Sequence, residues 1–318
     1  MRLVSGRNRM RIAVVGTGGV GGYYGARLAQ KKHEVSFIAR GAHLQAIQRN
    51  GLQIKSVLSD LLIKPARATD KPTEVGPVDL VLFCTKAYDT ASAALEAKAL
   101  VGPTTTVVSL QNGLDAHEHI GKVVGMEHMI AGVTGIISTL EAPGIIKMAS
   151  DSPWVALGEL DGRLTPRVQA VGDAFREAGV ETDVSESIMV ELWTKLMIVS
   201  PLAGFGSLTR LPIGDYRSVP ETRILIAGLK REIADLAAAN HVTLQADVVE
   251  RTLAGIDGLP LLWKSSMQLD VESGHRSELE AIIGVICRKG RERGVPTPVA
   301  EMLYAALLPA DLKARRIA

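Results

Sequence analysis

Aromatic side chains, cysteines and long apolar runs are all scarce in this sequence of 318 residues. Aromatic residues make up 4% of the chain and hydrophobic residues 47%, so the core must be built from Ala, Val, Leu and Ile. Charged residues contribute 22%, which is ordinary for a globular protein and excludes a disordered chain. A length of this size favours two domains, at roughly 150 residues per domain.

The scarce residue types also indicate where the protein works. Cys84 lies in an apolar strand pattern and Cys287 in a helical pattern, which predicts two buried free thiols in a reducing compartment rather than a disulfide. A net charge of +2 gives no general field that attracts nucleic acid. The first residues are basic but lack the apolar segment of a signal peptide, and the longest uncharged run, 196–209, is too short to span a bilayer. We therefore expect a cytoplasmic protein with no nucleic-acid or membrane partner.

A strand, a glycine-rich turn and a helix follow one another near the start of the chain. The apolar run 11–15 leads into Gly-x-Gly-x-x-Gly, and residues 23–30 have a helical pattern. This is the context that the dinucleotide-binding fingerprint requires, although such glycines also occur in purely structural turns. The first glycine would make the tight turn, the second would admit a pyrophosphate, and the third would let the helix pack on the strand. We expect the dinucleotide to bind this loop: Gly16, Thr17, Gly18, Gly19, Val20 and Gly21.

The residue that follows the second strand distinguishes NAD from NADP. In a βαβ unit, an acidic residue about 20 positions past the glycines bonds the ribose hydroxyls of NAD, whereas a 2′-phosphate needs a cation there. After the strand pattern at 34–39 the sequence has Arg40 and no acid. A guanidinium binds phosphate bidentately. Arg40 therefore predicts NADP(H), and the alternative is a solvated surface arginine.

Two later strands end in polar residues at the edge where open α/β sheets bind ligands. The near-continuous apolar run 78–84, typical of a parallel strand covered on both faces, leads to Lys86. Lys86 could contact a phosphate or a substrate carboxylate, or it could be a solvated loop lysine. The strand pattern 105–110 leads to Asn112 and Gly113. Asn112 could bond a substrate oxygen and a ribose, or it could simply form a turn with the glycine.

The pattern changes from alternating strands and helices to helices alone near residue 186. Alternation followed by a run of helices predicts an α/β fold, with an N-terminal Rossmann-type dinucleotide-binding domain at 10–186 and an all-α substrate and catalytic domain at 187–318. Residues 1–9 are expected to be a disordered extension. The histidines show no spacing that suits a metal ligand set, so no metal is predicted. The helical patterns of the second domain cover 188–199, 201–206, 221–240, 245–255, 262–271, 278–293 and 297–308.

The order of these motifs resembles the ketopantoate reductase family, the 2-dehydropantoate 2-reductases that make pantoate for pantothenate and coenzyme A. The resemblance covers residues 10 to about 308. It rests on the glycine loop, on Arg40-Gly41, on Thr85-Lys86-Ala87-Tyr88 and on Gln111-Asn112-Gly113. Two further matches, more specific to the family, are Glu191-Leu192-Trp193-Thr194-Lys195-Leu196 and Ser265-Ser266-Met267 with Glu278 after it.

The resemblance implies a role for each matched polar residue. Lys195 would be the general acid that protonates the alkoxide formed when a ketone accepts a hydride. A lysine on a largely apolar helix has a pKa lowered by desolvation, although such a lysine can also extend to solvent. Asn112 would contact the substrate and the nicotinamide ribose, and Ser266 would bind the substrate carboxylate. Glu278 would accept from a substrate hydroxyl or position the lysine; the alternative is a solvated charge at a helix N-terminus.

Two positions depart from the family's pattern. Well-studied members carry asparagines four and eight residues after the lysine, where this chain has Val199 and Ala203. At about 0.5–1.5 kcal/mol per hydrogen bond, losing both amides could weaken ketopantoate binding by about one to two orders of magnitude. Ser200 is an alternative donor beside them.

The function expected from the sequence is NADPH-dependent reduction of 2-dehydropantoate to pantoate in a cytoplasmic oxidoreductase. One alternative keeps the same machinery but assigns a different small 2-oxo acid as substrate, because of Val199 and Ala203. The other is a regulatory protein that binds NADP without turnover, which would need none of Lys195, Asn112 and Glu278. A helical domain rich in Ala and Leu could also form a homodimer.

Overall fold

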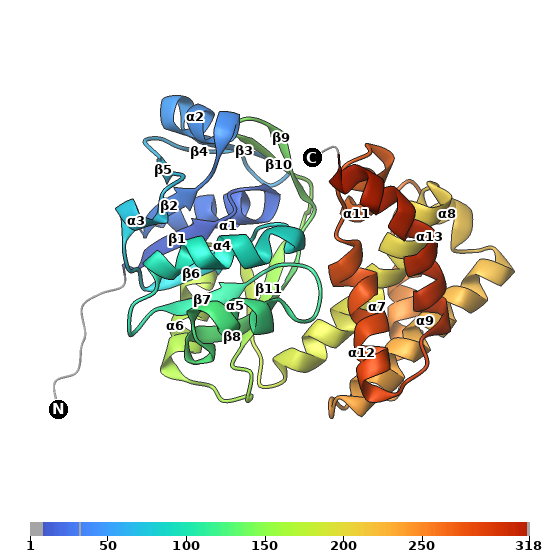
Figure 1. Ribbon diagram of the computed structural model, residues 1–318. Helices are drawn as coiled ribbons and strands as arrows, with labels where there is room; N and C mark the ends of the chain where they lie inside the picture. The colour runs from blue at the N-terminus through green and yellow to red at the C-terminus, as the bar shows by residue number, and fades with distance from the viewer. Residues whose placement is uncertain (1–8, 32, 317–318) are drawn as a thin grey trace. The chain divides into compact units, whose positions relative to one another are not determined.

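The computed structural model describes residues 9–31 and 33–316, and the chain divides into two compact units (Figure 1). The first unit comprises the chain up to residue 111 together with 116–188. The second comprises 112–115 together with 189 onward. The fold class expected from the sequence, an α/β unit followed by a helical unit, is confirmed. All but one residue of the expected N-terminal extension, 1–9, lies outside the described residues.

The first unit is built on an eight-stranded sheet in the order β12-β11-β8-β7-β6-β1-β2-β5. All neighbours from β5 to β8 are parallel, β11 is antiparallel to β8, and β12 is parallel to β11. Because β2 and β6 flank β1 on opposite sides, the strand order reverses at β1, and ligands bind open sheets at such a reversal. The strands are β1 (Arg11–Val15), β2 (Glu34–Ile38), β5 (Arg67–Thr69), β6 (Leu80–Phe83), β7 (Thr106–Ser109), β8 (Met129–Gly135), β11 (Trp154–Gly158) and β12 (Glu181–Val184).

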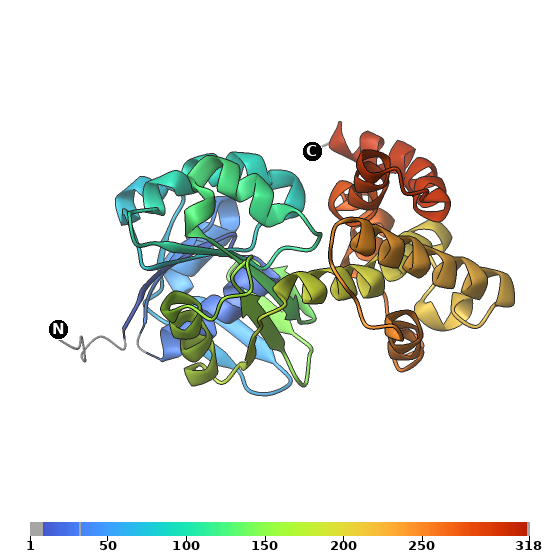
Figure 2. The same cartoon turned by 90° about the horizontal axis from the view of Figure 1, so that it is seen from below.

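Helices cover both faces of this sheet (Figure 2). Tyr24 and Phe175 bring α1 and α6 onto one face, while Ala94 and Ile120 bring α4 and α5 onto the other. The central strands are therefore buried on both sides, as the apolar sequence of β6 predicted. The helices of this unit are α1 (Gly19–Gln30), α2 (Gly41–Asn50), α3 (Pro72–Val75), α4 (Thr90–Ala97), α5 (Ala116–Val124) and α6 (Pro166–Glu177).

A second, four-stranded sheet in the order β4-β3-β10-β9 packs on α1. Its strands are β3 (Leu52–Ser56), β4 (Leu61–Ile63), β9 (Ser138–Ala142) and β10 (Ile145–Met148). The parallel pair of β3 and β10 joins segments that are far apart in sequence. Contact with α1 is close, because a Cβ built on Gly22 would lie 2.8 Å from Ile146 Cγ1. This sheet therefore fixes the helix whose first turn begins at the glycine loop.

The second unit is helical over its described length. After α7 (Ile188–Thr209), its longest helices are α9 and α13, which contact each other, and α9 also contacts α10 and α12. A π-helical turn, Glu280–Gly284, comes directly before α12. The helices that follow α7 are α8 (Ile213–Tyr216), α9 (Pro220–Ala239), α10 (Val248–Asp257), α11 (Ser266–Glu272), α12 (Val285–Arg293) and α13 (Pro298–Arg315).

The helix α7 differs from the sequence prediction because it is continuous. Proline lacks the N–H of an α-helical hydrogen bond, which is why the pattern predicted a break after residue 199. The helix instead runs for 22 residues with Pro201 inside it. By length and composition it could cross a membrane, contrary to the expectation from its uncharged run, but 61% of its most apolar window is buried inside the protein. Such burial is typical of the core helix of a globular protein.

Candidate active site

The glycine loop between β1 and α1 has the geometry that the fingerprint predicts. Gly16 has φ of +91°, and a Cβ on it would lie 2.6 Å from the backbone N of Thr85. A Cβ on Gly21 would lie 2.2 Å from the carbonyl oxygen of Gly16, so only glycine lets α1 approach the loop. A Cβ on Gly18 would meet no atom within 4 Å. The loop is therefore tight where the protein packs on itself and open at its middle glycine.

These features fit a dinucleotide. The open side of Gly18 leaves room for a pyrophosphate, and the first turn of α1 presents backbone N–H groups and the positive end of the helix dipole. The hydroxyl of Thr17 is not free for this purpose, because it donates to the carbonyl of Ile38 at 3.0 Å. That bond ties the loop to the carboxyl end of β2, where the predicted cofactor cation follows.

The two predicted cations of the first unit lie at carboxyl ends of strands. Arg40 follows β2 and precedes α2, and its guanidinium forms an ion pair with Glu96 at 2.6 Å. The side chains of this pair are 60% and 46% exposed, so a phosphate could replace the carboxylate. Lys86 follows β6, is partly buried, and precedes the 3-10 turn Ala87–Asp89.

The loop after β7 belongs to the helical unit. Gly113 has φ of +104°, and a Cβ on it would lie 2.8 Å from the carbonyl oxygen of Ala281 in the π-helical turn. Asp115 forms an ion pair with Arg288 of α12. Glycine at position 113 thus allows the close approach that places Asn112 among the helices.

Lys195, Glu278 and Asn112 come together in this unit. The amide Nδ2 of Asn112 donates to Oε2 of Glu278 at 3.4 Å, and Glu278 is only 5% exposed. Burial lowers the pKa of Lys195 to about 8, and the carboxylate of Glu278 opposes part of that shift. The burial of Glu278 argues against a solvated charge at a helix end. The three residues thus combine a buried carboxylate, an amide and an ammonium group that releases its proton near neutral pH.

A buried aspartate holds the segment that carries Glu278. Oδ1 of Asp311, which is 3% exposed, accepts from the backbone N of Ser277 at 2.9 Å and from its hydroxyl at 2.7 Å. Arg315 binds the other oxygen of this carboxylate at 2.6 Å. On the other side of Glu278, the π-helical turn begins two residues later, and such turns often occur at functional sites. The orientation of Glu278 therefore depends on contacts on both sides of it.

Ser266 is exposed and is the first residue of α11, whose N-terminus is capped by the side chain of Ser265. Its predicted contact with a substrate carboxylate remains a prediction.

The two positions that depart from the family's pattern follow Lys195 at intervals of one helical turn. Val199 is partly buried and Ala203 is fully buried. Residues spaced by four lie on one face of a helix, so the face of α7 that carries Lys195 continues with apolar residues. Ser200 does not replace the missing amides, because it is fully buried and its hydroxyl donates to the carbonyl of Leu196 at 2.6 Å.

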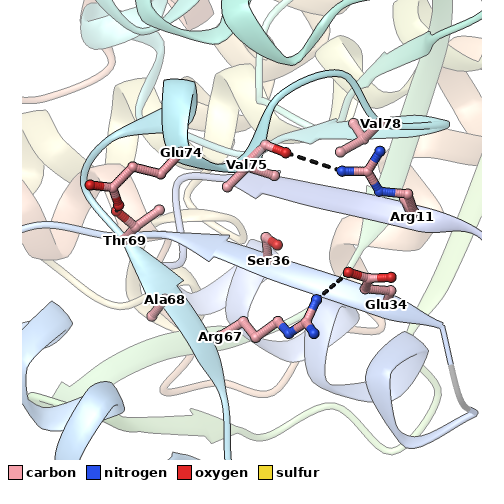
Figure 3. A pocket seen from close by; sticks show the side chains of 9 residues that line it. All are labelled: Arg11, Glu34, Ser36, Arg67, Ala68, Thr69, Glu74, Val75 and Val78. Atoms are coloured by element: carbon pink, nitrogen blue, oxygen red, sulfur yellow. Dashed lines mark hydrogen bonds and ion pairs between the residues drawn. The ribbon is translucent and has the colours of Figure 1, made fainter.

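One cavity of the first unit lies away from this site. It has a volume of about 410 Å³ and lies at the amino ends of β1 and β2, lined by Arg11, Glu34 and Arg67 among others (Figure 3). Arg67 pairs with Glu34, and Arg11 donates to the carbonyl of Val75 at 3.1 Å. This edge of the sheet is opposite to the one that carries the glycine loop, so we assign it no part in the chemistry.

Both units match models of one protein family. Residues 12–162 match the model described as "Ketopantoate reductase PanE/ApbA", and residues 187–310 match that of its C-terminal domain. The chain belongs to the ketopantoate reductase family. It is therefore a member of a family of dinucleotide-dependent oxidoreductases, as the resemblance of its motifs predicted.

Individual relatives agree with this assignment. A 2-dehydropantoate 2-reductase of Caulobacter vibrioides is 30% identical, over 95% of this chain and 99% of the relative. The crystal structure of 2-dehydropantoate 2-reductase from Geobacter metallireducens GS-15 superposes with a TM-score of 0.89 at 30% identity, covering 94% of this chain and 99% of that one. A D-mandelate dehydrogenase in a ternary structure with NADH and anilino(oxo)acetate has a TM-score of 0.88 at 25% identity, covering 96% and 99%.

The sequence interpretation missed several residues that contact the elements carrying the candidate site residues. Asp311 accepts from Ser277, and His43 of α2 accepts from the backbone N of Gly144. Both partners are distant in sequence, and no local pattern indicates such contacts. Lys230 stands in an ordinary amphipathic pattern, yet it is fully buried. The one available signal was Pro201 within an apolar helix. A proline leaves the carbonyl four residues before it without a backbone donor, so that carbonyl needs a donor from elsewhere. Among the described residues, no three His, Cys, Asp or Glu side chains form a group that could hold a metal.

Proposed function

We propose that this protein reduces 2-dehydropantoate to pantoate with NADPH. The observation that carries the proposal is the group formed by Lys195, Glu278 and Asn112 in the helical unit of a chain whose first unit carries a dinucleotide loop. The nicotinamide supplies the hydride when the cofactor is bound. A purely regulatory protein would have no use for a partly buried lysine with a pKa lowered to about 8.

In the proposed reaction the keto carbon receives a hydride, and the oxygen becomes an alkoxide that needs a proton. Lys195 donates that proton from Nζ, and solvent reprotonates the resulting amine. The negative charge of Glu278 opposes the lowering of the Lys195 pKa by desolvation, so a larger fraction of Lys195 stays protonated. Asn112 and Ser266 would orient the substrate, and Arg40 and Lys86 would bind cofactor phosphates. We infer a cytoplasmic enzyme from the reducing environment that its two free thiols favour.

A second candidate is reduction of a 2-oxo acid with an apolar side chain. The observation that favours it is that Val199 and Ala203, both apolar, follow Lys195 at intervals of four residues on one face of α7, where the family carries asparagines. The similarity to a D-mandelate dehydrogenase supports this candidate as well. Both candidates use the same proton donor and differ only in the side chain of the 2-oxo acid that is reduced.

A panel of 2-oxo acids followed by NADPH oxidation at about 340 nm tests both candidates, and kcat/KM ranks the substrates. The panel should include 2-dehydropantoate, a branched aliphatic 2-oxo acid and an aryl 2-oxo acid. Highest kcat/KM with 2-dehydropantoate supports the first proposal, and preference for an apolar acid supports the second. Binding of NADPH without turnover of any member would overturn both.

A further inference from the structure

Pro201 creates an unusual requirement in the helix that carries Lys195. In an α-helix the N–H of residue 201 would donate to the carbonyl of residue 197, but proline has no N–H. The Met197 residue is fully buried, so water does not readily supply the missing donor. A buried carbonyl without a partner is destabilising, which makes this turn the weak point of α7 unless another group donates.

Lys230 of α9 supplies that donor. Its Nζ lies 2.8 Å from the carbonyl oxygen of Met197, and the whole residue is 0% exposed. Lysine is rarely buried completely, because its charge is costly to remove from water. Burial lowers the pKa of Lys230 to about 7, with a smaller lowering from Arg223 and an opposing effect of Asp257. Both the ammonium and the neutral amine can donate a hydrogen bond, so the contact does not require the charge.

The position of this contact relates it to the active site. Met197 is two residues after Lys195, and the neighbouring carbonyl of Leu196 accepts from the hydroxyl of Ser200. Two side chains thus supplement the backbone bonds of the turn that follows Lys195. An apolar side chain of similar length would fill the space at lower desolvation cost, so packing alone does not explain a lysine at position 230.

We propose that Lys230 is a positioning residue for Lys195. It gives Met197 the hydrogen bond that Pro201 cannot give, and it thereby keeps the turn of α7 after Lys195 helical. The proposal rests on the proposed function, in which Lys195 is the proton donor. It assigns to Lys230 no contact with substrate or cofactor.

The test exchanges one donor for another. In Lys230→Met the Met197 carbonyl loses its partner, and we expect kcat for the best 2-oxo acid to fall by about tenfold, since misplacement of a catalytic group by about 1 Å can cost more than that. KM for NADPH should stay within about twofold. Pro201→Ala restores a backbone N–H to the same carbonyl, so the double variant should recover kcat to within about twofold of Pro201→Ala alone.

Two further variants serve as controls. Lys230→Gln, which keeps a donor, should lose less activity than Lys230→Met. Lys313→Met, at an exposed position of α13, is the matched lysine-to-methionine control.

The variants also separate positioning from general stability. A displaced Lys195 would titrate differently, so the pH at which kcat declines should move in Lys230→Met and return in the double variant. Unchanged kcat and pH profile in Lys230→Met would overturn the proposal, as would a loss of kcat that Pro201→Ala does not repair.

Thermal midpoints keep this test distinct from that of the proposed function. Pro201→Ala should raise the midpoint more in the Lys230→Met background than in the wild type, because only there does the new N–H find an unpaired carbonyl. Equal gains in both backgrounds would refute the hydrogen-bond exchange. If no 2-oxo acid is reduced while the gains differ, the proposed function fails and the exchange stands.

Discussion

At the scale of single residues, Lys195 combines a partly buried position with an acidic neighbour. Its pKa of about 8 is set mainly by desolvation, which favours the neutral amine, and is held from falling further by Glu278. Protonated lysine is the form that acts as an acid, so the reduction needs pH values below this pKa.

We therefore expect kcat for reduction to be level below about pH 8 and to decline above it, because the proton is lost as pH rises through the pKa of Lys195.

Lys195→Ala should lower kcat by about 10²–10⁴-fold, the usual contribution of a general acid. Glu278→Gln should move the decline to lower pH, since without the carboxylate nothing opposes the lowering of the Lys195 pKa by desolvation. A pH profile of kcat under saturating NADPH checks all three. Wild-type kcat that rises steadily through pH 9 would exclude Lys195 as the acid.

Cofactor preference is also decided by single residues. If Arg40 binds the 2′-phosphate, Arg40→Ala should lower kcat/KM for NADPH by about tenfold or more, because a charge-assisted hydrogen bond contributes about 1.5–3 kcal/mol. Glu96 competes for the same guanidinium in an exposed ion pair of the kind that contributes about 0–1 kcal/mol. Glu96→Gln should therefore improve kcat/KM for NADPH by up to about fivefold.

NADH is the internal control for both variants, because it has no 2′-phosphate. Its kcat/KM should change little in either. If kcat/KM changed by the same factor with NADPH and NADH, Arg40 would not bind the 2′-phosphate.

At the scale of elements, His43 joins three parts of the first unit. Its Nδ1 accepts from the backbone N of Gly144 at 2.9 Å, so the ring is the tautomer in which Nε2–H donates to the carbonyl of Thr17 at 2.7 Å. The ring thereby connects α2, the turn between β9 and β10, and the glycine loop. Burial lowers the pKa of His43, and the bond to Thr17 partly opposes this.

We expect His43→Ala to raise KM for NADPH several-fold with little change in kcat, because the glycine loop loses a support and Lys195 is untouched. In the wild type, NADPH affinity should fall only on the acid side, below the ordinary histidine pKa of about 6.5, since a protonated Nδ1 cannot accept from Gly144. Fluorescence titration of NADPH across pH measures this directly. His119→Ala, at an exposed position, is the control, and an acid-side loss that persists in His43→Ala would contradict the role.

Local pattern predicted the elements whose burial is set within their own sequence. The run Leu80–Phe83 is buried on both faces and forms a central parallel strand, and the glycine loop has its predicted geometry. The alternating strands and helices of the first unit and the helices of the second could be predicted for the same reason. The prediction that α7 ends before Pro201 was wrong because it assumed that no side chain donates to the carbonyl that proline leaves unpaired. Lys230 donates to that carbonyl, which belongs to Met197. The second sheet was equally hidden, since β3 and β10 pair across a long sequence separation.

The candidate site was predictable only as a set of residue types at the right spacings. The sequence placed Lys195, Asn112 and Glu278 in it through the family resemblance. What it could not show was that the loop at 112–115 packs with the helical unit, or that Asp311 fixes the backbone beside Glu278. These contacts join residues far apart in the chain, and they depend on tertiary packing rather than on local periodicity.

At the scale of the whole molecule, burial of ionisable groups links stability to pH. Lys230 and Lys195 have pKa values of about 7 and about 8 in the folded protein, against an ordinary value of about 10.4 for an unfolded lysine. Between these values the unfolded chain binds more protons than the folded one, so the free energy of unfolding rises with pH. The thiols of Cys84, which is partly buried, and of Cys287, which is buried, act in the opposite direction, because desolvation raises their pKa values to about 12 and about 11. They do so only where an unfolded thiol ionises, near pH 8.5 and above.

The window from about pH 7 to about pH 8.5 therefore isolates the two lysines. We expect the urea midpoint of unfolding to be higher at pH 8.5 than at pH 7, because folding no longer has to bury two charges against desolvation. Lys230→Met removes one of the two groups and should reduce this pH dependence, while Lys313→Met, at an exposed site, should leave it unchanged. A midpoint that falls across the window, or a Lys230→Met variant that keeps the full wild-type dependence, would show that Lys230 carries its charge in the folded protein. In that case its bond to Met197 would be that of a permanent ammonium, and the desolvation argument for its lowered pKa would fail.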